Sequence, residues 1–541
     1  MNNHLYQFKN MPNEPIKQYA PGSKEREELK QMLDKMSNQV LDIPIIIGGK
    51  EIRTGKTQTS VMPHNHKHVL ANYHVAGKEE LQMAINAAME AKKIWAEIPW
   101  DQRASIFLRA AELLATKYRQ ILNASTMLNQ SKTPFQAEID SACEIIDFWR
   151  FNVQFMSEIY SNQPISPVGM LNRLEYRPLE GFIVAISPFN FTSIAANLAT
   201  APAMMGNTVI WKPASTAIVS GYYLMQLYKE AGLPDGVINF VPSSGKMVSE
   251  VLLTDSNFAG VHFTGSTGTF NSIWKTVGEN LPKYKSYPRL VGETGGKDFV
   301  FVHNSATPDA VAVALLRGAF EYQGQKCSAA SRAYIPASLW DKVWGKMEAD
   351  LKTVKMGDIK DFSNFMGAVI DKSAFDDITS YITRAQKSDK AKIIYGGNFD
   401  DSVGYFIEPT VIKVTDPKYE TMQIELFGPV LTIYVYEDEK YEETLQLCDQ
   451  TSPYALTGAI FANCRQAIMV ANQKLRNAAG NFYINDKPTG AVVGQQPFGG
   501  ARQSGTNDKA GSFLNLVRWI SPRTIKETFS PPTNYRYPYM D

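Results

Sequence analysis

Residues 182–186 read Phe-Ile-Val-Ala-Ile, an apolar run that is too short for a helix and is ended by a Ser-Pro pair. A second run, Thr-Val-Ile-Trp-Lys, occupies 208–212, and residues 194–205 between the two runs have helical apolar spacing. Strands that alternate with helices at this spacing predict a parallel sheet covered on both faces. Ligands of such sheets bind at the carboxyl ends of the strands. Further strands are expected at 237–241 and 260–264, and further helices at 217–231, 247–253 and 269–278.

A second α/β segment follows, from Asp298 to about Asp486, and its first expected strand is 299–302. A chain of 541 residues is too long for one hydrophobic core, so we expect two or three domains. Before the first sheet, amphipathic helices with packing roles are expected at 81–95, 103–118 and 136–151, and a polar helix at 25–36.

Two stretches outside these segments alternate apolar and polar residues as exposed strands do. They are Leu171–Arg177, before the first sheet, and Trp519–Ile525, after the second α/β segment. Together they predict a hairpin arm that pairs with another subunit. Sheet edges that are only blunted by solvent are the alternative.

The charge balance excludes some partners. Lysine and arginine number 55 and aspartate and glutamate 54, so a net charge of +1 gives no reason to expect nucleic acid or an anionic membrane. No apolar run approaches the roughly 20 residues of a membrane span. Residues 1–20 contain no arginine and lack the apolar core of a secretory signal. A cytoplasmic protein is expected, with the mitochondrial matrix as the alternative if a presequence has been removed.

Four scattered cysteines form no C-x-x-C pair and no zinc spacing, which predicts a reducing compartment and no metal site. Cys327 differs from Cys143, Cys448 and Cys464 because the small residues around it leave its sulfur approachable. An open, polar loop before a helix would favour the reactive thiolate form. The alternative for this stretch is a buried cysteine at the start of a helix.

Four further positions carry groups suited to chemistry at strand ends. The glycine-containing turn at 263–269, where a strand meets a helix, could hold a pyrophosphate, and Lys212 could bind ribose or phosphate oxygens. Glu293, in apolar surroundings, could be a general base, and Asn190 could donate a hydrogen bond to an oxyanion. Each group also has an ordinary interpretation: a common turn, a solvated lysine, an exposed glutamate and a turn asparagine.

The order of these motifs resembles the aldehyde dehydrogenase superfamily over about residues 45–525. Within the superfamily, the chain is most similar to the branch that oxidises glutamate 5-semialdehyde. Three stretches carry this similarity: residues 187–192, Glu321-Tyr322-Gln323-Gly324-Gln325-Lys326-Cys327-Ser328, and the run 490–509. The motifs are S-P-F-N-F from 187, W-K-P from 211, F-T-G-S from 263, E-T-G-G-K from 293, G-Q-K-C-S from 324, E-L-F-G-P from 425 and P-F-G-G-A-R-Q-S-G from 497.

The resemblance implies an α/β fold with three parts. They are a Rossmann-like NAD-binding domain (1–160 and 182–297), an α/β catalytic domain (298–495) and a β-hairpin oligomerisation arm (161–181 and 515–541). It further implies that the thiolate of Cys327 attacks the aldehyde carbon, while Asn190 and the Cys327 backbone N–H hold the oxyanion. Hydride passes to nicotinamide, and Glu293 activates the water that hydrolyses the resulting thioester.

The resemblance also implies the binding residues. Ser328 and the loop at Gly490 and Ala491 would hold the substrate carboxylate, although some relatives have serine where this chain has Ala491. Phe498 would pack on the substrate methylenes. Cofactor contacts fall on Ser187, Lys212, Gly265, Ser266, Glu425 and Phe427. NAD is the expected cofactor, but Ser215 stands where many NAD-specific members have a glutamate, so NADP is not excluded.

The leading expectation is NAD-dependent oxidation of L-glutamate 5-semialdehyde, formed from 1-pyrroline-5-carboxylate, to L-glutamate in the second step of proline catabolism. One alternative is another carboxylated aldehyde or a broader range of aldehydes. A non-catalytic structural protein is the other, and the intact set of Cys327, Glu293, Asn190 and Lys212 argues against it. A homodimer or higher homo-oligomer is expected, with a proline-oxidising enzyme as a candidate partner and no nucleic acid or membrane.

Overall fold

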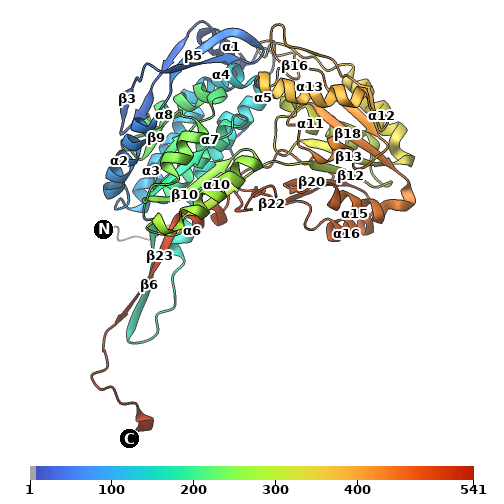
Figure 1. Cartoon of the computed structure of the whole chain (residues 1–541). Coiled ribbons are helices and arrows are strands. Elements are labelled where there is room, and N and C mark those ends of the chain that lie inside the picture. The colour runs from blue at the N-terminus through green and yellow to red at the C-terminus, as the bar shows by residue number, and fades with distance from the viewer. Residues whose placement is uncertain (1–7, 541) are drawn as a thin grey trace.

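The computed structural model of this chain describes residues 8–540 and consists of two lobes with an arm that projects from the first (Figure 1). The first lobe is built on a seven-stranded sheet in the order β11-β10-β7-β8-β9-β2-β3. In that order the strands are Arg289–Glu293, Phe258–Thr264, Phe182–Ile186, Thr208–Lys212, Ile238–Phe240, Ile45–Ile47 and Lys50–Ile52. The strands predicted at 182–186 and 208–212 are confirmed with the same bounds. The first five strands run parallel, and the antiparallel β2 and β3, which were not predicted, extend the sheet at one edge.

Side chains of the central strands alternate between two cores, because successive residues of a strand point to opposite faces. In β8, Val209 and Trp211 pack with α3, α4, α6, α7 and α8, whereas Ile210 packs on the other face with α2 and α10. The sheet is therefore covered on both faces, as predicted. The helices are α2 (Lys78–Trp95), α3 (Trp100–Leu113), α4 (Arg119–Gln130), α6 (Ile145–Ser161), α7 (Thr192–Met204), α8 (Ile218–Ala231) and α10 (Thr267–Glu279), with α1 (Lys24–Ser37) packed on α4.

Several predicted helices differ from the structure in their bounds. The helix expected at 81–95 begins at Lys78, where the Glu80 carboxylate accepts a hydrogen bond from the Gly77 N–H. The stretch expected at 136–151 is longer and is interrupted: α5 (Pro134–Ala137) leads into a π-helical turn, η2 (Glu138–Glu144), which continues as α6. The segment at 247–253 is mostly a π-helical turn, η4 (Val248–Leu252).

The second lobe contains another seven-stranded sheet, in the order β14-β17-β18-β13-β12-β20-β21. In that order the strands are Ala391–Tyr395, Thr410–Val414, Val430–Tyr436, Ala330–Pro336, Asp298–Val302, Thr457–Phe461 and Asn481–Ile484. All neighbours run parallel except β14, which is antiparallel to β17. One face is covered by α11 (Pro308–Phe320) and α12 (Ala337–Leu351), and the other by α13 (Lys372–Gln386), α15 (Tyr441–Thr451) and α16 (Arg465–Lys474).

A small sheet of the first lobe contacts the second lobe at the top of Figure 1. Its strands, in the order β1-β5-β4, are Leu41–Ile43, Asn65–His74 and Thr57–Met62. The His66 N–H donates to the Val403 carbonyl at 3.0 Å, and the Tyr405 N–H donates to the Pro63 carbonyl at 3.1 Å. These backbone bonds connect the lobes on the side opposite the arm.

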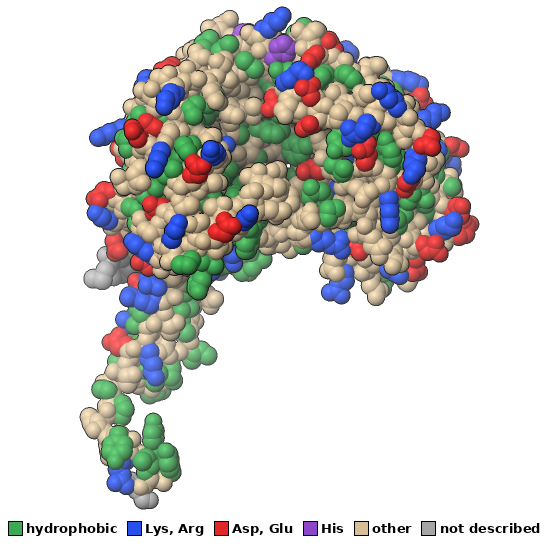
Figure 2. All heavy atoms as spheres, in the orientation of Figure 1, with side chains coloured by type: hydrophobic (Ala, Val, Ile, Leu, Met, Phe, Trp, Pro, Cys, Tyr) green, Lys and Arg blue, Asp and Glu red, His purple; other side chains and the backbone are tan. Residues whose placement is uncertain are grey.

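The arm is a two-stranded antiparallel ribbon of β6 (Met170–Pro178) and β23 (Ile520–Thr528). Both strands were expected from their alternation of apolar and polar residues, and within one chain they pair with each other. Apolar side chains gather along the arm and at its tip (Figure 2), where Val168, Phe529 and Tyr539 are among the exposed large residues. A ribbon of two strands leaves an unpaired edge on each side, so the arm offers both apolar surface and backbone groups to a partner.

None of the helices within residues 8–540 is long and apolar enough to cross a membrane.

Candidate active site

Cys327 lies in the loop between a 3-10 turn, η6 (Glu321–Gly324), and strand β13. The prediction that a helix follows this cysteine is wrong: helix α11 ends before it, and a strand comes after it. The loop turns sharply because Tyr322, Gln323 and Gly324 all have positive φ. At Gly324 an added Cβ would lie 2.3 Å from the carbonyl oxygen of Gly428, so only glycine fits there.

Two glutamine side chains hold this turn in place. The Gln323 amide nitrogen donates to the carbonyls of Ser131 (3.0 Å) and Ala368 (2.7 Å). The Gln325 amide oxygen accepts from the Ile370 N–H at 2.9 Å. Both glutamines are buried, so the nucleophile loop is fixed to both lobes by bonds that water does not compete for.

The Cys327 thiol is half-buried and has three carboxylates around it. Burial raises its pKa well above the usual value, and the nearby charges of Glu293, Asp298 and Glu425 raise it further. The expectation that an open, polar loop favours the thiolate is therefore wrong for the resting protein. The sulfur carries its proton at neutral pH, and attack on an aldehyde requires a proton acceptor.

Glu293 ends strand β11 and lines the same cavity as Cys327. Burial raises the pKa of its carboxyl to about 8, an effect that the positive charge of Lys509 partly opposes and the negative charge of Asp508 adds to. A carboxyl group with this pKa exchanges its proton in the neutral to mildly alkaline range. The geometry is that of a general base beside a thiol.

Asn190 follows strand β7 at its carboxyl end and is buried. Its amide nitrogen donates to the Gln325 carbonyl at 3.1 Å, two residues before Cys327. A primary amide has two N–H donors, so this bond orients the group and leaves a second donor beside the nucleophile loop.

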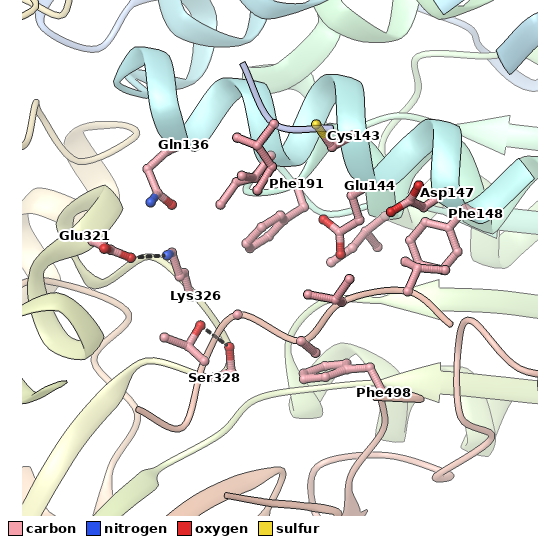
Figure 3. A pocket seen from close by; sticks show the side chains of 18 of the residues that line it. Gln136, Cys143, Glu144, Asp147, Phe148, Phe191, Glu321, Lys326, Ser328 and Phe498 are labelled. Atoms are coloured by element: carbon pink, nitrogen blue, oxygen red, sulfur yellow. Dashed lines mark hydrogen bonds and ion pairs between the residues drawn. The ribbon is translucent and has the colours of Figure 1, made fainter. Parts of the chain in front are cut away.

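A cavity of about 1000 Å³ extends from Cys327 and Glu293 between the two lobes. Every position for which the sequence predicted a substrate contact lines it: Ser328, Gly490, Ala491 and Phe498. The Ser328 hydroxyl donates to the Thr489 hydroxyl at 2.9 Å (Figure 3), which places it directly against the loop that contains Gly490. The backbone N–H groups of Gly490 and Ala491 donate to no protein acceptor among residues 8–540.

The opposite wall of the cavity comes from η2 and α6, for which the sequence predicted only packing roles. Figure 3 shows Glu144 and Phe148 on this helical stretch, and Gln136 on α5 before it, on the side of the cavity opposite Ser328 and Phe498; Cys143 and Asp147 also line the cavity. One helix face therefore forms part of the candidate site. A signal was present, because Asp140, Glu144 and Asp147, spaced by four and three residues, put acids on one face of a stretch that is otherwise rich in apolar residues.

Glu144 is the most informative of these residues. Its carboxylate accepts a hydrogen bond from the Ser193 hydroxyl at 2.8 Å and faces the cavity. Burial raises its pKa to about 8, and the negative charge of Asp140 adds to the effect. Without a cation in the cavity this carboxyl is largely protonated at neutral pH, and a cationic ligand would favour its ionised form.

The expected cofactor positions meet at the carboxyl edge of the first sheet. Ser187 follows β7, Lys212 ends β8, and Gly265 with Ser266 follows β10. Glu425 and Phe427 come from the second lobe; the Glu425 carboxylate accepts from the Gly296 N–H at 2.8 Å, and Phe427 contacts Phe189 edge-on. Segments distant in sequence are thus brought together at this edge, beside the nucleophile loop.

This edge has the groups that a dinucleotide needs. The exposed Ser266 caps α10 by accepting from the Thr269 N–H at 3.2 Å, and a Cβ on Gly268 would meet nothing within 4 Å. The first turn of a 13-residue helix is therefore open to an anion. Burial lowers the pKa of the Lys212 amine, which makes an anionic or hydroxyl ligand favourable beside it.

Comparison with known proteins identifies the class. The sequence profile of the "Aldehyde dehydrogenase family" matches residues 52–522, and the chain belongs to this family. Its relatives include two mitochondrial delta-1-pyrroline-5-carboxylate dehydrogenases. The protein of Dictyostelium discoideum is 58% identical, over 98% of this chain and 95% of the relative. The protein of Homo sapiens is 48% identical, over 98% of this chain and 94% of the relative. The crystal structure of the Mycobacterium tuberculosis delta-pyrroline-5-carboxylate dehydrogenase bound with NAD is 53% identical, covers 100% of both chains and has a TM-score of 0.96.

Proposed function

We propose that this chain oxidises L-glutamate 5-semialdehyde to L-glutamate with NAD as the hydride acceptor. The observation that carries the proposal is the cavity that joins the Cys327 thiol and the Glu293 carboxyl to the free N–H groups of Gly490 and Ala491. The names of the relatives support the same substrate, since glutamate semialdehyde is the open form of 1-pyrroline-5-carboxylate.

The reaction begins when the Cys327 sulfur attacks the aldehyde carbon and its proton passes to a base. A water molecule or the ionised carboxylate of Glu293, which lines the cavity beside the thiol, accepts this proton. The carbonyl oxygen becomes an oxyanion, which accepts hydrogen bonds from the Asn190 amide and from the Cys327 backbone N–H. Ser187, Lys212, Gly265 and Ser266 at the carboxyl edge of the first sheet would hold NAD, which would supply the hydride acceptor. Loss of the hydride from the carbon and re-formation of the C=O bond leave a thioester on Cys327.

Hydrolysis of the thioester uses the ionised form of Glu293, after the proton released from Cys327 has passed to solvent. The carboxylate takes a proton from water, the water oxygen attacks the thioester carbon, and the C–S bond breaks to release L-glutamate. The sulfur of Cys327 takes the proton back from Glu293, which regenerates the thiol. Because the pKa of Glu293 is raised to about 8, the fraction of enzyme with the base ionised increases as the pH rises toward that value. Hydrolysis therefore depends on Glu293 more strongly than thioester formation does.

The cavity wall matches the charged groups of an amino-acid aldehyde. The Ser328 hydroxyl and the N–H groups of Gly490 and Ala491 would hold the carboxylate without burying a positive charge. Across the cavity, Glu144 is the carboxylate that a substrate ammonium group would pair with. Phe498 lies on the same side of the cavity as Ser328, where it can pack on the methylene carbons.

The direct test is the initial rate of NADH formation with three five-carbon aldehydes: glutamate semialdehyde, glutarate semialdehyde, which lacks the ammonium group, and pentanal, which has neither charged group. We expect kcat/KM to be highest for glutamate semialdehyde and lower for pentanal by at least about 100-fold, since two charge-assisted hydrogen-bonded groups are lost. Equal kcat/KM values for all three aldehydes would contradict the proposal. Running the same assay with NADP measures how far Ser215 relaxes the cofactor preference.

Ser328→Ala is expected to lower kcat/KM for glutamate semialdehyde by roughly 10- to 150-fold, because a hydrogen bond to a charged group contributes roughly 1.5–3 kcal/mol. Pentanal makes no such bond, so its kcat/KM should change little. The two rates are measured on the same preparation. Equal losses for both aldehydes would mean that Ser328 supports the loop through its bond to Thr489 and does not contact the substrate.

We further propose that the arm assembles the protein into a homo-oligomer. Deleting residues 523–541 removes most of β23 and keeps Trp519 and Ile520, which are buried in the first lobe. We expect light scattering to give a smaller particle mass for this variant than for the full chain. Without β23 the arm no longer presents the strand edges and apolar side chains that would contact another subunit. An unchanged particle mass would rule out the arm as an assembly element.

Two biological assignments complete the proposal. A proline-oxidising enzyme is the candidate partner, and the similarity to proline utilization A from Bdellovibrio bacteriovorus supports this: 30% identity, a TM-score of 0.91, and coverage of 96% of this chain but 53% of that one. The mitochondrial names of several relatives favour the matrix over the cytoplasm. Microscopy of the chain fused at its carboxyl end to a fluorescent protein distinguishes the two compartments.

A further inference from the structure

A segment near the amino terminus runs along the helical wall of the cavity. Glu14 pairs with Arg119 at 2.6 Å and with Arg150 at 2.8 Å, and the Lys17 N–H donates to the buried carboxylate of Glu138 at 2.9 Å. The Tyr19 hydroxyl donates to the same carboxylate at 2.7 Å. Buried, charge-assisted bonds of this kind hold the segment in one position on η2 and α4.

Asn13 connects this segment to both walls of the cavity. Its amide nitrogen donates to the Asp147 carboxylate of α6 at 2.7 Å and to the Val493 carbonyl at 2.8 Å. Its amide oxygen accepts from the Gln495 side chain at 2.8 Å. The Glu14 N–H donates to the other oxygen of Asp147 at 2.7 Å. Asn13 thus bridges helix α6 and the loop of residues 490–496.

The loop depends on such contacts, because residues 485–500 contain no helix or strand. Gly490 and Gly494 have φ values of 97° and 82°, and glycine allows many other conformations there. Met11 adds an apolar contact by packing against the cluster of Phe148, Phe151 and Val493. The N-terminal segment therefore supplies both polar and apolar contacts to the loop.

We propose that Asn13 is a positioning residue that holds the loop 490–496 against α6, so that the N-terminal segment contributes to selection of a carboxylated aldehyde. The inference rests on the proposed function, in which the Gly490 and Ala491 N–H groups bind the substrate carboxylate. Its physical basis is that the Val493 carbonyl and the Asp147 carboxylate are both acceptors. Two acceptors cannot bond to each other, and the Asn13 amide, with two N–H groups, donates to both and so holds them close together.

Two substitutions and a control test this inference. Asn13→Ala removes the bridge, and Asn13→Asp keeps its shape while placing acceptors against the Val493 carbonyl and Asp147. Both should raise KM for glutamate semialdehyde about tenfold, equivalent to one hydrogen bond to the substrate carboxylate, with kcat within about twofold of wild type. Lys9→Ala, an exposed position in the same segment, should change neither value.

A loss of general stability would not show this selectivity. Pentanal does not use the carboxylate subsite, so its kcat/KM should stay within about twofold in the Asn13 variants. With pentanal as the reporter, inhibition by the product glutamate should weaken by the same factor of about ten. Equal losses for both aldehydes, or an unchanged KM for glutamate semialdehyde, would overturn the inference.

Failure of the proposed function would be seen separately, as a wild-type enzyme that does not prefer glutamate semialdehyde. If the Asn13 variants do not fold, Gln495→Ala removes a single bond to Asn13 from the other side. It should raise KM for glutamate semialdehyde by about threefold, with pentanal unaffected. An unchanged KM in that variant would equally overturn the inference.

Discussion

Replacing Cys327 by serine is expected to abolish aldehyde oxidation, with kcat/KM falling by at least about 10⁴-fold. A hydroxyl group is a far weaker nucleophile than a thiol and gives up its proton at much higher pH. Burial beside the carboxylates of Glu293 and Asp298 already raises the pKa of the thiol, and the same surroundings would disfavour an alkoxide more strongly. NADH formation with glutamate semialdehyde measures the loss.

NAD binding should survive in the Cys327→Ser variant, because the expected cofactor contacts lie on other elements at the edge of the first sheet. Quenching of tryptophan fluorescence on titration with NAD checks this. Cys464→Ser is a matched control, since Cys464 is exposed and does not line the cavity, and its activity should match wild type. Wild-type turnover by Cys327→Ser would remove the nucleophile assignment.

Glu293→Gln should separate the two halves of the reaction. An amide cannot accept the proton from water, so thioester hydrolysis should slow by about 10²- to 10⁴-fold, and more than thioester formation. Rapid mixing at saturating NAD should then show a burst of about one NADH per active site followed by a slow phase. If both phases slow equally, or neither slows, Glu293 is not the base for hydrolysis.

The pH dependence gives an independent check on Glu293. Burial raises the pKa of this carboxyl to about 8, so the protonated, inactive form predominates below that pH and the ionised form above it. When hydrolysis limits the wild-type rate, kcat should therefore increase as the pH rises through about 8 and then level off. Glu293→Gln has no titrating group at this position, and its slow phase should lack that step.

Much of the architecture follows from local patterns. Residues 182–186 and 209–211 are all apolar because both faces of the sheet are buried, and the bounds of both strands, 182–186 and 208–212, were predicted without error. The alternation of apolar and polar residues in β6 and β23 indicated half-exposed strands, because successive side chains of a strand point to opposite faces. The antiparallel β2 and β3 could not be predicted, because three-residue strands carry too little periodic signal.

The chemistry of the site was predicted less completely. The resemblance pointed to Cys327, Glu293 and Asn190, and the structure brings all three to one place between the lobes. The ionisation of the thiol was expected in the wrong direction. A pKa depends on burial and on charges from β11, β12 and the 425–429 loop, which are distant in sequence and close in space.

The sequence by itself determined the central strands and helices of the first sheet, the alternation of the arm and the motif residues, because each depends on neighbours within a few positions. Only the tertiary structure decided that Glu144 faces the cavity and that Asn13 bridges helix α6 and the 490–496 loop. Asn13 and Val493 are 480 residues apart, yet their hydrogen bond is 2.8 Å long. Such a contact exists only after both lobes and the N-terminal segment have packed, so no local pattern can reveal it.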